Sequence, residues 1–241
     1  MPRLDAAACT ALLAPLTALS VRAAQAIRSA GSGGVRIKAD GSPVTPADEA
    51  AEATIRDGLA GLAPDVPIIS EEQAERTKPV VAAASYFLVD PLDGTREFIA
   101  GRDEYTVNIA VVTDGVPILG IITAPALHVS FRGIVGRGAE RIALDGGGDG
   151  SPSRAIRSRA RPQRGLVVVV SRSHLEARTQ AYIDALPAAK TLACGSALKF
   201  CRVAEGSADL YPRLAPTHDW DIAAGHAILK AAGGKIGRAH V

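Results

Sequence analysis

Acidic residues gather at the ends of predicted strands and helices, and together they could do chemistry. Glu71 ends one apolar segment, Asp90 and Asp93 end another, Asp221 begins a late helix, and Asp48 is a further candidate. Converging carboxylates repel one another unless a hard cation neutralises them. Mg²⁺ takes oxygen ligands and keeps water and substrate phosphate in its shell. The pattern therefore predicts a Mg²⁺ site suited to transferring a phosphoryl group to water.

The segment Asp90-Pro91-Leu92-Asp93-Gly94-Thr95 is the strongest of these patterns. Its proline-fixed turn can aim both carboxylates and the Leu92 carbonyl at one point. Gly94 and Thr95 then supply N–H groups and a hydroxyl for a phosphate. An acidic surface turn is the alternative, and we would favour it for an isolated motif. The position directly after an apolar strand, with the other acids similarly placed, favours the metal site.

Composition bounds the partners and the compartment. Among 241 residues, 47% are hydrophobic and 22% are charged, as in a globular protein, and the net charge of +2 does not imply a nucleic acid or a membrane. The three cysteines form no C-x-x-C pair, so we expect neither disulfides nor zinc but a reducing, cytoplasmic compartment. Peripheral contact with the inner membrane stays open. No apolar run approaches 18 residues, so no transmembrane segment is expected.

The first part of the chain must position most of these acids. Apolar residues at helical spacing over 4–27 predict a helix, which Pro15 should kink or split. Thr45-Pro46-Ala47-Asp48 reads as a capped helix start. Apolar runs, with Asp114-Gly115 as a hairpin turn, predict an antiparallel-rich sheet. We place this α+β part at residues 1–150.

The second part, residues 151–241, should be a smaller α/β unit that supplies Asp221. A glycine-rich stretch and five arginines at 145–164 predict a surface loop and domain connection; a nucleic-acid arm is disfavoured because no aromatics interleave with the arginines. The expected elements that follow are a strand at 166–170, a helix at 175–186, a helix from Gly195 to about 206, a strand at 208–214 and a helix at 220–232.

Two of these segments carry a family resemblance. Residues 90–95 and Trp220-Asp221-Ile222-Ala223-Ala224-Gly225 resemble the two signatures of the inositol monophosphatase superfamily, and the likeness runs from the first helix to Gly234. Segments 42–45, 95–99, 171–174 and 195–201 are similar to its 3′(2′),5′-bisphosphate nucleotidase branch. The resemblance implies a layered α-β-α-β-α sugar-phosphatase fold and hydrolysis of 3′-phosphoadenosine 5′-phosphate to AMP.

The resemblance also implies roles for individual residues. Two to three Mg²⁺ ions would be bound by Glu71, Asp90, the Leu92 carbonyl, Asp93 and Asp221. Glu71 and Thr95, with Asp48 polarising Thr95, would position and deprotonate the attacking water. The relatives are typically inhibited by Li⁺. The expected substrate contacts are Glu71, Leu92, Asp93, Gly94, Thr95, His174, Gly195, Ser196, Lys199, Arg213 and Asp221.

Substrate choice depends on a few of these positions. Arg213 stands where the inositol-specific branch has a glutamate, and a guanidinium there favours a second phosphate. Lys199 beside Gly195-Ser196 would add positive charge, although both cations could equally be solvated on the surface. For His174, contact with the base or ribose is weighed evenly against an ordinary place at a helix start. The expected partner is a small phosphorylated nucleotide and not a nucleic-acid polymer; no oligomeric state is indicated.

Other readings keep the metal site but change the function. One is an inositol monophosphatase or sugar bisphosphatase. Another is a non-catalytic Mg²⁺- or nucleotide-binding protein, which the intact acid set argues against. The tail Ile236–Val241 is what a common sequencing-adapter read would encode, so we expect the chain to be truncated at its C-terminus.

Overall fold

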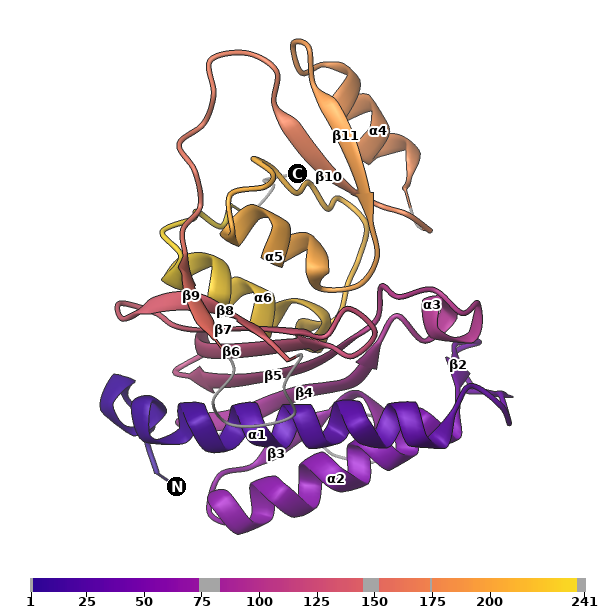
Figure 1. Cartoon of the computed structure of the whole chain (residues 1–241), viewed down its shortest axis with the longest axis vertical. Coiled ribbons are helices and arrows are strands. Elements are labelled where there is room, and N and C mark those ends of the chain that lie inside the picture. The colour runs from indigo at the N-terminus through magenta and orange to yellow at the C-terminus, as the bar shows by residue number, and fades with distance from the viewer. Residues whose placement is uncertain (1, 74–82, 145–151, 174, 238–241) are drawn as a thin grey trace.

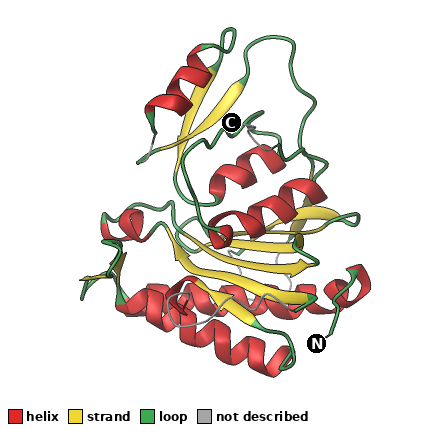
Figure 2. Cartoon of the chain, turned by 180° about the vertical axis from the view of Figure 1, so that it is seen from behind, coloured by secondary structure: helices red, strands yellow, loops and turns green. Residues whose placement is uncertain are grey.

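The computed structural model describes residues 2–73, 83–144, 152–173 and 175–237. These residues form stacked layers of helix and sheet (Figure 1). The layers are, in order, α1 and α2, a seven-stranded sheet, α5 and α6, a sheet of β10 and β11, and α4 (Figures 1 and 2). The helix bounds are α1 Ala6–Ala30, α2 Pro46–Leu62, α3 Thr95–Ile99, α4 Ala177–Asp184, α5 Leu198–Ala204 and α6 Asp219–Ala231. The predicted layered α-β-α-β-α fold is confirmed.

The large sheet is almost entirely antiparallel, as predicted. Its strands lie in sequence order and only β3 and β4 pair in parallel. The bounds are β3 Ile68–Ser70, β4 Ser85–Asp93, β5 Thr106–Thr113, β6 Val116–Ala124, β7 Val129–Ile134, β8 Gly138–Ala143 and β9 Ser153–Ile156. Every residue of β5 is buried, because helices cover both faces of the sheet. Asp114 (φ 51°) and Gly115 (φ 75°) form the predicted hairpin turn, with the two positive φ angles of a type I′ turn.

Pro15 is predicted to kink or split the first helix. Helix α1 is continuous over 25 residues, so the predicted split is wrong. Its buried face, which includes Leu16, Leu19 and Ile27, packs against α2 and β6, and this packing holds the helix together across the missing N–H. By length and composition α1 could cross a membrane, with a mean hydropathy of 1.5. A buried face packed on a sheet is the arrangement of a core helix.

Helix α2 begins at the predicted capping box. The Thr45 side chain accepts from the Ala47 N–H at 3.2 Å, and Asp48 Oδ2 accepts from the Thr45 N–H at 2.8 Å. Both groups satisfy donors that the first helical turn would otherwise leave without a partner. A two-stranded hairpin, β1 Arg36–Ile37 with β2 Pro43–Val44, precedes this helix, and a short 3₁₀ turn at Glu71–Gln73 follows β3.

The second half of the chain brings corrections. Ser153–Ile156, predicted within a loop, is the edge strand β9; three of its residues are exposed, which left no apolar pattern to detect. Residues 208–214 are not a strand, and only Leu210 makes a bridge, to Val168. A strand that sequence reasoning missed, β11 (Lys190–Cys194), pairs in parallel with β10 (Val167–Ser171), and its exposed residues likewise show no alternation. Helix α5 begins at Leu198, three residues after Gly195.

Contacts cross the predicted boundary at residue 150. Strand β9 pairs with β8, and α6 packs on β5, β6 and β7 of the large sheet. The packing is close: a Cβ atom added at Gly120 in β6 would lie 2.1 Å from the Ala224 carbonyl oxygen of α6. The boundary stays a prediction. The C-terminal helix reaches the sheet that carries Asp90 and Asp93, and it brings Asp221 with it. The predicted loop over 145–150 lies outside the described residues.

Candidate active site

A cavity of about 220 Å³ lies where the start of α3, the turn before α5 and the start of α6 meet. The two halves of the chain both line it. Of the predicted site residues, the lining includes Glu71, Asp93, Gly94, Thr95, Gly195, Ser196, Lys199, Arg213 and Asp221. A larger cavity of about 1150 Å³ adjoins it and shares Ser42, Glu71 and Asp221 with it. The structure thus brings together segments that lie more than 100 residues apart.

The end of β4 carries two buried carboxylates. The pairing register with β5 shifts between Asp90 and Asp93, so the strand is irregular where the motif begins. Asp90 is 1% exposed, and burial raises its pKa well above the usual range, with the negative charges of Glu71, Asp93 and Asp221 adding to the shift. The negative charges of the other three carboxylates therefore disfavour ionisation of Asp90. A divalent cation bound beside them would relieve that repulsion.

The surroundings of Asp93 shift its pKa in opposing directions. Burial raises its pKa to about 6 and the Asp221 charge acts in the same direction. The Lys199 charge and the Asn108 Nδ2, which donates at 3.3 Å, act in the opposite direction. Asp93 is therefore the point where the acidic side and the basic side of the cavity meet.

The Thr95 hydroxyl is held beside a carboxylate. Thr95 Oγ1 lies 3.1 Å from Asp48 Oδ1 and 3.1 Å from the Leu92 carbonyl oxygen, and it can donate to either. Asp48 is 2% exposed, and its other oxygen accepts from the Thr45 hydroxyl at 2.6 Å. The capping box of α2 therefore fixes the carboxylate that faces Thr95. Gly94, with φ 93°, precedes Thr95 in a conformation that favours glycine.

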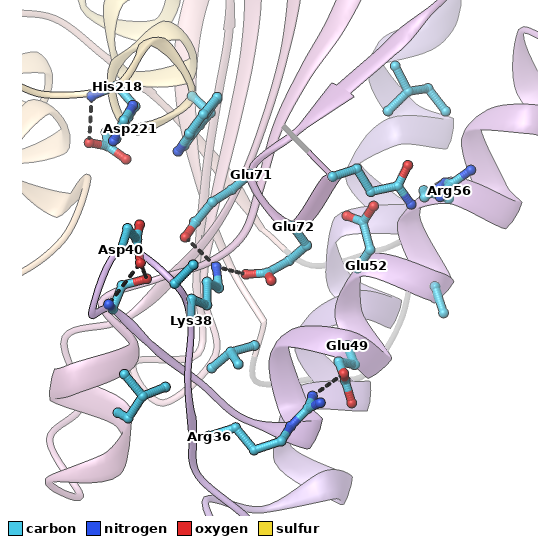
Figure 3. Close-up of a pocket in the computed structure, with 18 of the residues that line it drawn as sticks. Arg36, Lys38, Asp40, Glu49, Glu52, Arg56, Glu71, Glu72, His218 and Asp221 are labelled. Atoms are coloured by element: carbon cyan, nitrogen blue, oxygen red, sulfur yellow. Dashed lines mark hydrogen bonds and ion pairs between the residues drawn. The ribbon is translucent and has the colours of Figure 1, made fainter. Parts of the chain in front are cut away.

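Glu71 and Asp221 have partners of their own. Lys38 Nζ donates to Glu71 Oε1 at 2.9 Å and to Glu72 Oε1 at 2.6 Å, as Figure 3 shows. Thr217 Oγ1 donates to Asp221 Oδ2 at 2.6 Å. Within the described part of the chain, no group of three or more Asp, Glu, His or Cys side chains lies close enough to hold a metal ion as placed. The donors fit a hard cation in kind, since all are oxygens, and in charge, since they repel one another.

The lining of the cavity also has a basic side, formed by Lys199 and Arg213. Lys199 is 5% exposed, so the alternative of a solvated surface charge is wrong for this residue. Its Nζ donates to the Ser196 carbonyl oxygen at 2.5 Å and lies 5.5 Å from the Tyr211 ring centroid. Burial lowers the pKa of Lys199, and the Asp93 charge acts against that shift. Arg213 is exposed at the rim, where its Nη2 donates to the Pro216 carbonyl oxygen at 3.2 Å.

Among the described residues that line this cavity, Ser196 has a side-chain hydroxyl without a hydrogen-bond partner. Its Oγ is buried and makes no hydrogen bond, although the residue lines the cavity. The backbone at Ser196 has φ 45°, which places it in the left-handed region. A buried hydroxyl without a partner costs free energy that a bound polar ligand can recover. His174 lies outside the described residues.

Sequence reasoning missed several residues that contact the predicted site, among them Lys38, Asn108, Tyr211 and Thr217. Asn108 had a signal, because it is a polar residue inside the apolar run of β5 and is 1% exposed. Lys38 had none. It lies in the β1–β2 hairpin, and its link to Glu71 depends on how that hairpin packs.

Comparison with known proteins is consistent with this geometry. The profile of the Inositol monophosphatase family matches residues 10–240. The 3′(2′),5′-bisphosphate nucleotidase CysQ of Escherichia coli K12 is 46% identical over 200 residues, which are 83% of this chain and 77% of that protein. The corresponding protein of Buchnera aphidicola is 41% identical over 202 residues, covering 84% and 73%.

Solved structures agree with the sequence relatives. The crystal structure of CysQ from Bacteroides thetaiotaomicron, described as a bacterial member of the inositol monophosphatase family, superposes with a TM-score of 0.73 at 34% identity, covering 93% of this chain and 87% of that one. An inositol monophosphatase from Anabaena has a TM-score of 0.70 at 24% identity, covering 94% and 82%. The latter shows the fold alone.

Proposed function

Because the chain belongs to the inositol monophosphatase family, we propose that it is a Mg²⁺-dependent 3′(2′),5′-bisphosphate nucleotidase. Its substrate would be 3′-phosphoadenosine 5′-phosphate, which it would convert to AMP and phosphate. The observation that carries this choice is the composition of the cavity: acidic residues around Asp93 and basic residues around Lys199 line it together, and the Asp93 and Lys199 charges interact. The identity to nucleotidases from several bacteria supports the same choice.

The acidic side would hold the cations. Glu71, Asp90, the Leu92 carbonyl, Asp93 and Asp221 are the proposed ligands of two to three Mg²⁺ ions. On binding a cation, Glu71 would give up its ion pair with Lys38. Asp221 would likewise give up its hydrogen bond from Thr217. When bound, Mg²⁺ supplies positive charge that stabilises the attacking and leaving oxygens of a phosphoryl transfer.

The protein groups around the phosphate would orient the reaction. Thr95 and Glu71 are proposed to position the attacking water and take its proton, with Asp48 accepting from the Thr95 hydroxyl at 3.1 Å. The Gly94–Thr95 backbone at the start of α3 would bind the phosphate through N–H groups. Water would attack the phosphorus directly, so no covalent phosphoenzyme would form.

The basic side would select the substrate. Ser196 offers its unpartnered hydroxyl, Lys199 a buried ammonium and Arg213 a guanidinium at the rim. A second phosphate satisfies all three of these groups, whereas a neutral polyol offers no charge for them. His174 and Gly195 are proposed to complete the contacts with the nucleoside. We further propose a cytoplasmic enzyme that acts in sulfur assimilation and is inhibited by Li⁺.

The test is phosphate release from 3′-phosphoadenosine 5′-phosphate and from inositol 1-phosphate, side by side, with Mg²⁺ and then with added Li⁺. Fast, Li⁺-sensitive release from the nucleotide alone is the expected result. Preference for the inositol ester would keep the metal site and overturn the substrate assignment. Release from neither compound, nor from a wider panel of phosphate esters, would favour a non-catalytic binding protein.

A further inference from the structure

A charged contact joins the two halves of the chain just outside the cavity. Glu104 lies in the segment that precedes β5, and Arg172 follows β10. Arg172 Nε donates to Glu104 Oε2 at 2.7 Å, and Arg172 Nη2 donates to Glu104 Oε1 at 2.8 Å. This is the two-bonded arrangement in which a guanidinium and a carboxylate bind most strongly. Neither residue lines the cavity.

The same carboxylate holds the turn that carries the substrate-facing residues. Glu104 Oε2 accepts from the Gly195 N–H at 2.9 Å, and Arg172 Nη2 also donates to the Ala193 carbonyl oxygen at 3.0 Å. The pair thus holds the backbone immediately before and immediately after the last residue of β11. Gly195 is followed directly by Ser196, and Lys199 comes one helical turn later.

The approach at Gly195 is close. A Cβ atom added there would lie 2.8 Å from the Glu104 carbonyl oxygen and 2.9 Å from the Glu104 Cβ. Glycine is therefore required by space rather than by its backbone angles. The pKa of Glu104 is lowered, first by its hydrogen bonds from Arg172, so the carboxylate stays ionised near neutral pH.

We propose that Glu104 and Arg172 are positioning residues that hold the 195–199 turn against the acidic side of the cavity. They would act on substrate recognition through Gly195, Ser196 and Lys199, and not on the attack at phosphorus. The proposal rests on the proposed function for its substrate. It adds Glu104, which the sequence did not single out, and it gives a role to Arg172, which lies in the 171–174 segment.

The test compares Glu104→Gln and Glu104→Ala with the wild type. The glutamine keeps an acceptor for the Gly195 N–H but loses the ion pair, whereas the alanine loses both. We expect the KM for 3′-phosphoadenosine 5′-phosphate to rise about tenfold in Glu104→Ala and less in Glu104→Gln, with kcat within about twofold. For p-nitrophenyl phosphate, which has no ribose or second phosphate, kcat/KM should not change. Arg3→Ala is the control, because Arg3 forms a similar but remote exposed pair with Asp114.

Two further measurements make the outcome decisive. Amide hydrogen exchange at Gly195 should be faster in Glu104→Ala than in the wild type, and this holds whatever the substrate is. The double variant Arg172→Gln, Glu104→Ala should lose less than the sum of the two single variants' losses, because both residues act on one turn. Equal losses on both phosphate esters, or unchanged KM and exchange, would overturn the proposal. Failure of the wild type to cleave the nucleotide, with altered exchange in the variant, would refute the substrate but keep the positioning role.

Discussion

Single side chains in and beside the cavity carry charges that the surrounding protein disfavours. Burial raises the pKa of Asp90 and Asp93 and lowers that of Lys199, so each of these groups is less stable in its charged form than in water. Functional sites commonly keep such unfavourable groups, at a cost to stability. Removing one should therefore affect activity and stability in opposite directions.

Asp93→Asn tests this opposition. Under the proposed metal assignment, turnover at saturating Mg²⁺ should fall by about 10³-fold. In EDTA, the melting temperature of the variant should exceed that of the wild type, because a neutral amide avoids the burial cost that raises the Asp93 pKa to about 6. Phosphate release and thermal unfolding measure the two effects. Asp114→Asn is the control, and unchanged turnover in Asp93→Asn would refute the metal assignment.

The sign of the pH dependence follows from the same shift. Between pH about 4 and 6 the folded protein keeps a proton on Asp93 that the unfolded chain releases. The metal-free protein should therefore lose stability as the pH rises through this range. Asp93→Asn should show a shallower decline when its unfolding in urea is followed at several pH values in EDTA.

Arg213→Glu tests substrate selection. Reversing the charge at the cavity rim should raise the KM for 3′-phosphoadenosine 5′-phosphate about 10- to 100-fold through lost attraction and added repulsion. Steady-state kinetics with this nucleotide and with inositol 1-phosphate would measure the change. Arg137→Glu, at an exposed turn between β7 and β8, controls for net charge. Nucleotide kinetics equal to the wild type's would remove Arg213 from the substrate contacts.

At the level of elements, the site depends on how closely α6 approaches the large sheet. Gly120 and Gly133 let the helix backbone and Ala231 come within the space that a Cβ would fill. This approach places Asp221, in the first turn of α6, near the end of β4. The capping box of α2 also positions a site residue, because it orients Asp48 toward Thr95.

Gly120→Ala tests the packing of α6. The new methyl group would meet the Ala224 carbonyl oxygen at 2.1 Å, so the helix must shift, and we expect a loss of about 2–4 kcal/mol in the free energy of unfolding. The control is Gly61→Ala in α2, where nothing lies within 4 Å of the added Cβ. It should gain up to about 1 kcal/mol from the lower entropy of the unfolded chain. Equal stability of both variants in urea would contradict the close approach.

At the level of the whole molecule, the layers bury all three cysteines, and each is a free thiol. Burial raises the pKa of the Cys9 thiol to about 11, and it also raises the pKa of Cys194 and Cys201. Thiolates are the reactive form, so the native protein should resist alkylation at pH 8. This agrees with packing, rather than catalysis, as the role of these residues.

Cys9→Ala tests the thiol shift. Above pH about 9 an unfolded chain ionises Cys9 while the folded protein keeps it protonated, so wild-type stability should fall as the pH rises from 9 toward 11. Other groups titrate in the same range, but the difference between wild type and Cys9→Ala isolates this thiol. Urea unfolding of both proteins at pH 8, 9 and 10 would measure it. A constant difference across these pH values would show that Cys9 does not contribute.

Turns, helix caps and amphipathic helices could be predicted from the sequence, because they depend on neighbouring residues. Turn chemistry identified the 90–95 motif, the Asp114-Gly115 hairpin and the Thr45–Asp48 capping box, because each depends on residues that are close to one another in the sequence. Apolar periodicity identified α1 and α2, which cover one face of the large sheet. The motif order was sufficient for the family and the layered fold.

Which distant residues meet depends on tertiary packing and could not be predicted from the sequence. The pairing of Lys38 with Glu71, of Asn108 with Asp93 and of Glu104 with Gly195 depends on how hairpin, strands and layers pack. The strands β9 and β11 also emerged only there, because mostly exposed strands show no apolar alternation and are defined by backbone bonds to a neighbour. Burial of Lys199 has the same origin. A charge at a helix start is ordinarily solvated, and only the layers packed over this one enclose it.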